Sequence, residues 1–223
     1  MPQFQFIEKL LECPFFQGIN KNDLHEIIGH TTFDFKKYEP GQIIVKAGTK
    51  CDGIVFVLNG TVSVTTESAN HNYSVEEFIS APIQLQPERL FGLRQTYYST
   101  FKAHTPCSTM FISKKEIVRL FHNYDVFSIN LTNYYATGIQ RLEDRQWSAS
   151  STSLRSHIIR FLTVHTLHPA GEKKFKIKMS TLGGILNDSR LDISKELNKM
   201  QDEGLVNLSR GLIHIPMLEA LFG

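Results

Sequence analysis

The sequence predicts an α+β fold in three parts. These are an N-terminal antiparallel β-roll of the jelly-roll kind with flanking helices, a long helix, and a C-terminal pair of helices followed by a β-ribbon. Short β-branched runs punctuated by glycine fill residues 33–113, and a proline-free helical pattern occupies 125–147. Two short amphipathic patterns and a strand pair follow within 180–215. We therefore expect domains at 1–113 and 148–223, connected by residues 114–147.

Composition indicates a globular protein. The 223 residues are 41% hydrophobic and 21% charged, and no apolar run is long enough to cross a bilayer. The N-terminal stretch lacks the basic and apolar regions of a signal peptide, so none is expected. Cys13, Cys51 and Cys107 are scattered and odd in number, which predicts reduced thiols in a cytoplasmic protein and gives no metal-binding spacing.

The first third of the chain changes from a helical to a two-residue period. Residues 4–31 read as short helices, with Asn20 as an N-cap and Asp23 in the first turn of the second helix. From Phe33 the apolar residues alternate. Asn59-Gly60 between two such alternations is a strong local signal for a β-hairpin. Many short strands at this spacing predict a sandwich or barrel.

The helix expected at 125–147 is long enough to span a whole domain. Its apolar stripe recurs at threes and fours. Such a helix either packs on its own barrel or pairs with a second copy. The stripe extends past any nearby strand, which favours a dimer interface. The residues expected on that interface are Phe127, Leu131, Tyr134, Tyr135, Gly138 and Leu142.

The polar run Ser148–Ser153 interrupts the helical pattern and is interpreted as a hinge. Beyond it the pattern predicts a helix at 154–166, a strand at 174–179 and a β-ribbon at 205–208 and 212–215. Residues 148–223 hold ten Lys/Arg and seven Asp/Glu, a net charge of +3, whereas residues 1–147 hold fourteen and fifteen. A basic C-terminal part is compatible with a polyanionic partner.

The two helices between the strand and the ribbon have distinct start and stop signals. Ser180 is expected to cap the first helix, and Asn187 tolerates the left-handed backbone of a tight turn. Gly183 lets the second helix cross closely. Ser189 and Asp192 form a capping-box pattern for the second helix. The residues expected inside are Leu182, Ile185 and Leu186 from the first helix and Ile193, Leu197 and Met200 from the second.

This arrangement is typical of a winged helix-turn-helix, whose second helix enters the major groove of DNA. Arg190 can bind guanine O6 and N7 at once, and Leu191 offers apolar contact to a thymine methyl. We expect base contacts from Ser189, Arg190 and Leu191. Contacts to phosphates, which position without specifying sequence, are expected from Ser180, Lys195, Lys199 and Arg210. A two-helix corner in any small domain has the same apolar pattern, so the local pattern alone leaves this function open.

Two blocks of the sequence, in this order, resemble the Crp/Fnr family of bacterial transcription regulators. The first is Tyr38–Val64, with Pro40-Gly41, Gly48, Asp52 and Gly60 where the family turns its roll. The second is Leu182–Val206, similar without a gap to the family's helix-turn-helix. The resemblance implies a cytoplasmic homodimer on palindromic double-stranded DNA, with RNA polymerase as a further partner. Ser189 and Arg190 match the family's Ser-Arg, but Leu191 stands where Glu is frequent, which puts the usual half-site in doubt.

The resemblance also bears on the effector. The cyclic-nucleotide binders of the family carry Gly-Glu and a later Arg-Ser/Thr-Ala, and the corresponding stretch Gln84–Ala103 has neither. Cyclic AMP is therefore not expected. The iron–sulfur branch needs an N-terminal cysteine cluster that Cys13 alone cannot supply. An unknown small-molecule effector is expected, in a pocket that draws on Glu88, Arg89, Tyr97, Tyr98 and Lys102. Haem, as a sensor of nitric oxide or carbon monoxide, stays open as an alternative cofactor.

Two other classes of protein compete with a regulator. A cupin-like metal oxygenase needs His-x-His, which none of the nine histidines provides. No P-loop, nucleophile elbow or dinucleotide-binding glycine pattern is present either, so an enzyme is not expected. The second rival is a ligand-binding adaptor whose winged helix docks a protein. Exposed Arg190, Lys195 and Arg210 argue for DNA instead.

Overall fold

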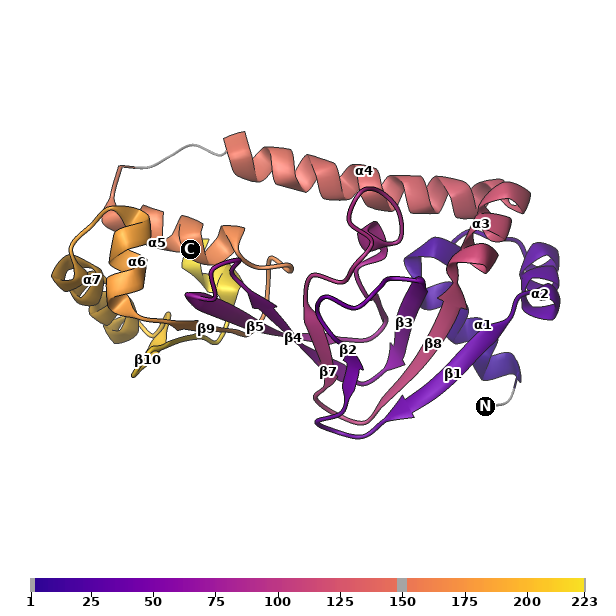
Figure 1. Cartoon of the computed structure of the whole chain (residues 1–223), viewed down its shortest axis with the longest axis horizontal. Helices are drawn as coiled ribbons and strands as arrows, with labels where there is room; N and C mark the ends of the chain where they lie inside the picture. Colours follow the sequence, from indigo (N-terminus) through magenta and orange to yellow (C-terminus); the bar gives the residue numbers. More distant parts are fainter. Residues whose placement is uncertain (1–2, 148–151, 223) are drawn as a thin grey trace. The chain divides into compact units, whose positions relative to one another are not determined.

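The computed structural model describes residues 3–147 and 152–222 (Figure 1). The chain forms two compact units. The N-terminal unit comprises residues 1–62 and 79–146, and the C-terminal unit comprises residues 63–78 and 147–223. Antiparallel sheets with several helices confirm the α+β class. This division differs from the expected segments 1–113, 114–147 and 148–223 in that residues 63–78 cluster with the C-terminal unit and residues 114–146 with the N-terminal unit.

The N-terminal unit is built on a four-stranded antiparallel sheet of order β1-β8-β3-β6, and its strands β2 and β7 pair with each other at the end of a second, seven-stranded sheet. Its strands are β1 (Phe33–Tyr38), β2 (Ile43–Val45), β3 (Gly53–Asn59), β6 (Ile83–Gln84), β7 (Thr100–Ala103) and β8 (Cys107–Ser113). Its helical elements are α1 (Gln3–Glu12), η1 (Pro14–Phe16), α2 (Lys21–His30), η2 (Pro87–Arg89), α3 (Lys114–Asn123) and α4 (Asp125–Trp147). The expected cap of α2 is confirmed, since the Asn20 side chain accepts from the Asp23 amide.

An aromatic cluster forms the centre of this unit. Phe15, Phe16, Phe56 and Phe127 are all fully buried. The ring of Phe15 stands edge-on to that of Phe56 at 5.8 Å and to that of Phe127 at 6.2 Å. Edge-to-face pairs at this separation are favourable beyond their buried area. The cluster therefore joins η1, the sheet and α4 into one core.

The hairpin expected at Asn59-Gly60 is wrong. β3 ends at Asn59, but its neighbours are β8 and β6, whereas β4 (Thr61–Glu67) pairs in another sheet. Gly60 has a φ of +95°, and a Cβ there would lie 2.4 Å from the Pro106 carbonyl oxygen. Glycine is thus needed for a corner between sheets, where the backbone passes another segment closely. An Asn-Gly pair suits both a hairpin turn and a corner between sheets, so the local sequence does not distinguish the two.

The long helix α4 has the predicted bounds, Asp125–Trp147. Its N-terminal half packs on its own unit: Phe127 and Leu131 are buried, and Tyr134 contacts the ring of Phe15 at 5.3 Å. Gly138 and Leu142 are exposed, as are Ile129 and Ile139. Four residues of the expected dimer interface therefore have partners within the chain, namely Phe127, Leu131, Tyr134 and Tyr135. The assignment of a dimer interface stays a prediction for the exposed part of the helix.

The C-terminal unit contains five strands of the seven-stranded sheet, in the order β10-β11-β9-β5-β4. Its elements are β4, β5 (Tyr73–Ser80), α5 (Leu154–Val164), β9 (Lys173–Ile177), α6 (Met179–Leu186), α7 (Arg190–Asp202), β10 (Asn207–Ser209), β11 (Leu212–Ile215) and η3 (Leu218–Phe222). One buried cluster unites Val75 of β5 with Phe175 of β9, Leu182 of α6 and Ile193 of α7. Residues from β5 are thus part of the core beneath the two helices.

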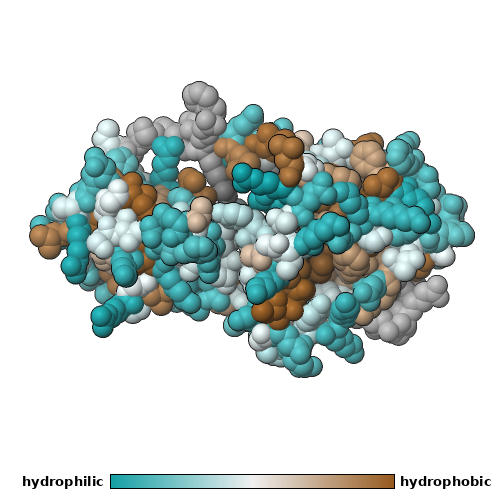
Figure 2. All heavy atoms as spheres, viewed as in Figure 1, coloured by the Kyte–Doolittle hydropathy of each residue, from teal (hydrophilic) through white to brown (hydrophobic). Residues whose placement is uncertain are grey.

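Two further expectations concern the linker and the surface. The expected hinge Ser148–Ser153 lies largely outside the described residues; Ser153 is the N-cap of α5 and accepts from the Ser156 amide. Within residues 3–147 and 152–222, no helix combines the length and apolar character needed to cross a membrane. On the face seen in Figure 2, hydrophilic side chains predominate and hydrophobic ones form separate patches.

The packing of α4 gives a first prediction. Phe127→Ala removes a fully buried ring and should destabilise the N-terminal unit by about 3–5 kcal/mol. Leu142→Ala, on the same helix but 64% exposed, should change the stability of an isolated chain by no more than about 0.5 kcal/mol. Urea denaturation at several protein concentrations measures both. A concentration-dependent loss in Leu142→Ala would place that residue in a dimer interface.

Candidate nucleic-acid interface

The α6–α7 corner is a tight turn formed by the three residues Asn187, Asp188 and Ser189. Asn187 ends α6 with a φ of 55° in the left-handed region, and the Asp188 amide donates to the Gly183 carbonyl at 2.9 Å. A Cβ on Gly183 would lie 2.8 Å from the Asp188 carbonyl oxygen. These observations confirm the roles predicted for Asn187 and Gly183. The close approach fixes the angle at which α7 leaves the turn.

The N-terminus of α7 is capped by side chains on both sides. The Ser189 hydroxyl accepts from the Asp192 amide at 3.1 Å and donates to the Asp192 carboxylate at 2.6 Å. The Asp188 carboxylate accepts from the Ser189 amide at 2.8 Å. The hydrogen bond from Ser189 and the charge of Lys195 lower the pKa of Asp192. The predicted cap is confirmed, and it holds the first turn in a defined conformation.

The first turn of α7 presents side chains to solvent. Ser189, Arg190 and Leu191 are all exposed, and the Leu191 side chain is 72% exposed although it is apolar. The inner face of the helix is buried through Ile193, Leu197 and Met200, as predicted. An exposed leucine beside an exposed arginine at a helix N-terminus is suited to contact an edge that is both polar and methylated, such as that of a base pair.

The residues expected to contact phosphate differ in whether a carboxylate lies beside them. Lys195 and Lys199 are exposed on α7 but pair with Asp192 at 3.6 Å and Glu196 at 3.3 Å. Arg210 is exposed in the turn between β10 and β11. Among the described residues, no ion pair involves Arg190 or Arg210. The charge of these two arginines is therefore not neutralised by a carboxylate among the described residues, and it is available to a ligand.

Two details of α6 correct the sequence-based expectations. The helix begins at Met179 with Lys178 as N-cap, so Ser180 lies within the first turn and does not cap it. The prediction missed this because serine is a common cap but a helix start can shift by one residue. Ile185 is 46% exposed and not buried, since the core beneath α6 is filled by Leu182. Ser180 itself is exposed, as a phosphate contact would require.

Two lysines missed by the sequence-based interpretation also belong to this surface. Lys178 directly precedes α6, and Lys176 lies on β9 opposite Leu212 of β11. Both side chains are exposed. Alternation along the strand could have identified Lys176 and Lys178, because buried Phe175 and Ile177 interleave with them. They add positive charge at the end of β9 and the start of α6.

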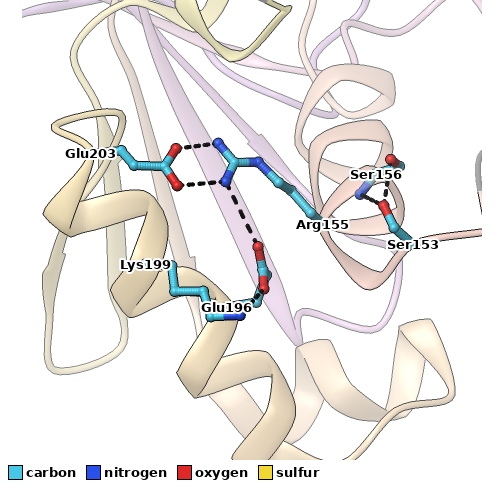
Figure 3. Close-up of polar contacts among 6 residues, drawn as sticks. All are labelled: Ser153, Arg155, Ser156, Glu196, Lys199 and Glu203. Atoms are coloured by element: carbon cyan, nitrogen blue, oxygen red, sulfur yellow. Dashed lines mark hydrogen bonds and ion pairs between the residues drawn. The ribbon is translucent and has the colours of Figure 1, made fainter.

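Arg155 connects α5 to α7, as Figure 3 shows. Its guanidinium donates to both carboxylate oxygens of Glu203, at 2.7 Å to Oε1, and lies 3.8 Å from Glu196. The hydrogen bonds from Arg155 lower the pKa of Glu203. Lys199 donates to the other oxygen of Glu196 at 3.3 Å. Bidentate pairs of this kind restrict geometry more than single contacts do, so α5 orients the C-terminal half of α7.

In the N-terminal unit, the loop that follows β6 is closed by its own side chains. Gln86 is buried and adopts the left-handed conformation, and its Oε1 accepts from the amides of Tyr98 at 2.9 Å and Ser99 at 3.2 Å. At the other end, Lys114 donates to the Leu90 carbonyl and to Gln95 Oε1, both at 2.8 Å. Gln86 therefore satisfies two amides of the loop, a contact that no local sequence pattern indicates.

The residues expected in the effector pocket fall into separate environments. Tyr97 is buried and donates to the Gly53 carbonyl at 3.3 Å, and burial raises its pKa. The guanidinium of Arg89 lies over the exposed ring of Tyr98 at 5.4 Å. Glu88 is partly exposed on η2. Lys102 is exposed on β7 opposite Ile43, and no described interaction joins it to the other four.

Helix α4 contacts this loop through two tyrosines. The Tyr135 hydroxyl donates to the Pro87 carbonyl at 2.9 Å. Burial, followed by the charge of Glu88, raises the pKa of Tyr134 to about 12. Both phenols are therefore neutral at physiological pH. No group of three His, Cys, Asp or Glu side chains within the described residues is arranged to hold a metal ion.

Comparison with known proteins identifies the class of this fold. Residues 35–124 match the family model of the cyclic nucleotide-binding domain. The Thermus thermophilus Catabolite Activator Protein has a similar structure, with a TM-score of 0.50 at 16% identity, covering 94% of this chain and 97% of that one. A putative Crp/Fnr-family regulator from Eubacterium rectale gives a TM-score of 0.52 at 22% identity, covering 94% and 97%.

The sensor domain of the transcriptional regulator DNR from Pseudomonas aeruginosa gives a TM-score of 0.53 at 17% identity, covering 68% of this chain and 98% of that one. No curated protein sequence matches the chain. The chain thus has the fold of Crp/Fnr transcription regulators, which confirms the resemblance found in the sequence.

Two adjacent glycines in α6 provide a sharp test of the corner. Gly183→Ala places a Cβ against the Asp188 backbone and should destabilise the C-terminal unit by about 1–3 kcal/mol. Gly184→Ala meets no atom within 4 Å and should stabilise the exposed helix by roughly 0.5–1 kcal/mol. Chemical denaturation of the two variants compares them directly. Equal effects would show that the corner is not constrained as described.

Proposed function

We propose that this protein is a homodimeric, sequence-specific transcription regulator that binds DNA through α6, α7 and the β10–β11 hairpin. The observation that supports it best is the first turn of α7, where Arg190 and Leu191 are exposed and Ser189 caps the helix. A helix of this size fits the major groove, with its N-terminal residues toward the base edges. The two helices and the hairpin then form a winged helix-turn-helix.

The charge distribution supports DNA over a protein partner. Arg190 and Arg210 have no ion-pair partner among the described residues, and Lys176 and Lys178 are exposed on β9 and at the start of α6. Each cation that meets a phosphate releases a counterion, so binding must weaken steeply with salt. An adaptor that docks a protein through the same helices would show no such slope. RNA polymerase as a partner, and the cytoplasm as location, follow from the function proposed.

The dimeric state is supported by α4. Ile129, Ile139 and Leu142 are 58%, 58% and 64% exposed, although they are large and apolar. Covering them with the same helix of a second copy would remove this surface from water. Two-fold symmetry then presents two α7 helices to a palindromic site about one turn of DNA apart.

The effector is proposed not to be a cyclic nucleotide. A cyclic phosphate needs free amides and an arginine, but the amides of Tyr98 and Ser99 are already bound by Gln86. Arg89 is engaged with the ring of Tyr98. The chain thus keeps the fold of a cyclic nucleotide-binding domain, but the Tyr98 and Ser99 amides donate to Gln86 of the same loop and not to a ligand.

The test of base reading is Arg190→Ala. A selection from random duplexes with the wild-type protein should enrich a two-fold-symmetric site. The variant should lose about 1–3 kcal/mol of discrimination at one base pair of each half-site while keeping salt-sensitive, non-specific binding. Lys195→Ala is the matched control, because a phosphate contact weakens all sequences alike. Unchanged selectivity in Arg190→Ala would remove this residue from base recognition, and protein capture without DNA enrichment would favour the adaptor.

The test of the effector is thermal denaturation with cyclic AMP. A ligand at 100 times its dissociation constant stabilises a protein by about 2.7 kcal/mol, a shift of several degrees. We expect no shift at millimolar cyclic AMP. Gln86→Ala, which frees the amides of Tyr98 and Ser99, is the companion variant. A clear rise in the melting temperature of the wild-type protein would contradict the proposal.

A further inference from the structure

Residues 63–78 join the C-terminal unit as an added strand pair. β5 pairs with β9 antiparallel over five residues, from Tyr73 opposite Ile177 to Glu77 opposite Lys173. Val75 is buried in the core that also holds Leu182 and Ile193, the inner residues of α6 and α7. Tyr73 packs against the rings of Phe161 and His165, each at 5.3 Å. The support of the two-helix corner thus includes a segment far from it in sequence.

One fully buried ion pair fixes this junction. The side chains of Lys173 and Glu77 are 0% and 1% exposed, and Lys173 Nζ lies 3.2 Å from Glu77 Oε2. Lys173 also donates to the Ala170 carbonyl at 2.7 Å. The Glu77 carboxylate accepts from the amides of Leu167 at 2.7 Å and His168 at 3.0 Å. Removing either side chain would leave the other charge buried without a counter-ion, which is strongly destabilising.

The segment that forms this junction begins and ends where the backbone passes from one unit to the other. The backbone passes between the two units at 62/63, 78/79 and 146/147. The first two crossings lie inside β4 and β5, which are hydrogen-bonded strands. Residues 63–78 are thus continuous with strands whose remaining residues belong to the N-terminal unit.

We infer that residues 63–78 are an integral part of the DNA-binding unit and that Glu77 is a positioning residue for DNA recognition. It acts by holding β5 on β9, and so through β9 and the core on α6 and α7. The inference rests on the proposed DNA-binding function. Residues 63–78 lie within the match to the cyclic nucleotide-binding domain, residues 35–124. The inference nevertheless gives them a role in the C-terminal unit.

The first experiment compares Glu77→Gln with Glu76→Gln in the full chain by hydrogen exchange and by DNA binding. Glu76 is the neighbouring residue, is only partly buried and is not part of the ion pair. We expect Glu77→Gln to raise amide exchange at least tenfold at Leu167, His168 and β9, and to leave β1 and β8 unchanged. DNA affinity should fall at least tenfold with an unchanged salt slope, because no phosphate contact is lost. Glu76→Gln should match the wild type.

Two results would overturn the inference: unchanged exchange in Glu77→Gln, or raised exchange with unchanged DNA affinity. The exchange measurement needs no DNA, so it reports on the junction even if the wild-type protein binds no DNA at all. In that case only the proposed function fails.

A second variant applies if Glu77→Gln does not fold. Ser74 and Lys176 are Cα partners in the β5–β9 register, and both side chains lie at the surface. Ser74→Cys together with Lys176→Cys should form a disulfide without denaturant, because paired strands place such residues within bonding range. The oxidised protein should bind its DNA as tightly as the same protein reduced. Loss of binding on oxidation would mean that DNA recognition requires β5 to leave β9.

Discussion

The C-terminal unit depends on the satisfaction of two charges that have no access to water. Glu77 and Lys173 lie on neighbouring strands, and their remaining hydrogen-bonding capacity is met by the Leu167 and His168 amides and the Ala170 carbonyl. A slip of β5 by one residue would turn Glu77 to the other face and leave Lys173 buried without a counter-ion. The ion pair therefore selects the register of β5 on β9. On its other edge β9 pairs with β11, so the same strand also carries the β10–β11 hairpin.

How much could be predicted from the sequence depends on how far apart the interacting residues lie. Features whose partners lie within a few residues were predicted. These are the caps at Asn20 and Ser189, the left-handed conformation of Asn187 and the bounds of α4. The corner at Asn59-Gly60 was not, because only contact with Pro106 distinguishes it from a hairpin. The membership of residues 63–78 was missed for the same reason, since Glu77 binds an amide 90 residues further on.

The candidate site divides in the same way. Exposure of Arg190 and Leu191 followed from the period of α7 and from its cap, so the first turn was predictable. The orientation of the helix was not, because Arg155 reaches Glu203 across 48 residues and neither residue has a local signature. The closure of the sensor loop by Gln86 was equally hidden. Glutamine at this position has no pattern that distinguishes a loop-closing side chain from a solvated one. Sequence periodicity thus identifies which residues face outward, and tertiary contacts decide where that face points.

These contacts also limit how an effector can act. A ligand shifts an equilibrium only by contacting two states differently. Separating β5 from β9 would expose a buried charge pair and a strand edge, which is a large cost for a small ligand to offset. A change that keeps this pairing has no such cost. For the proposed regulator we therefore expect β5, β9, α6, α7 and the β10–β11 hairpin to move together, with the register between β5 and β9 preserved in both states.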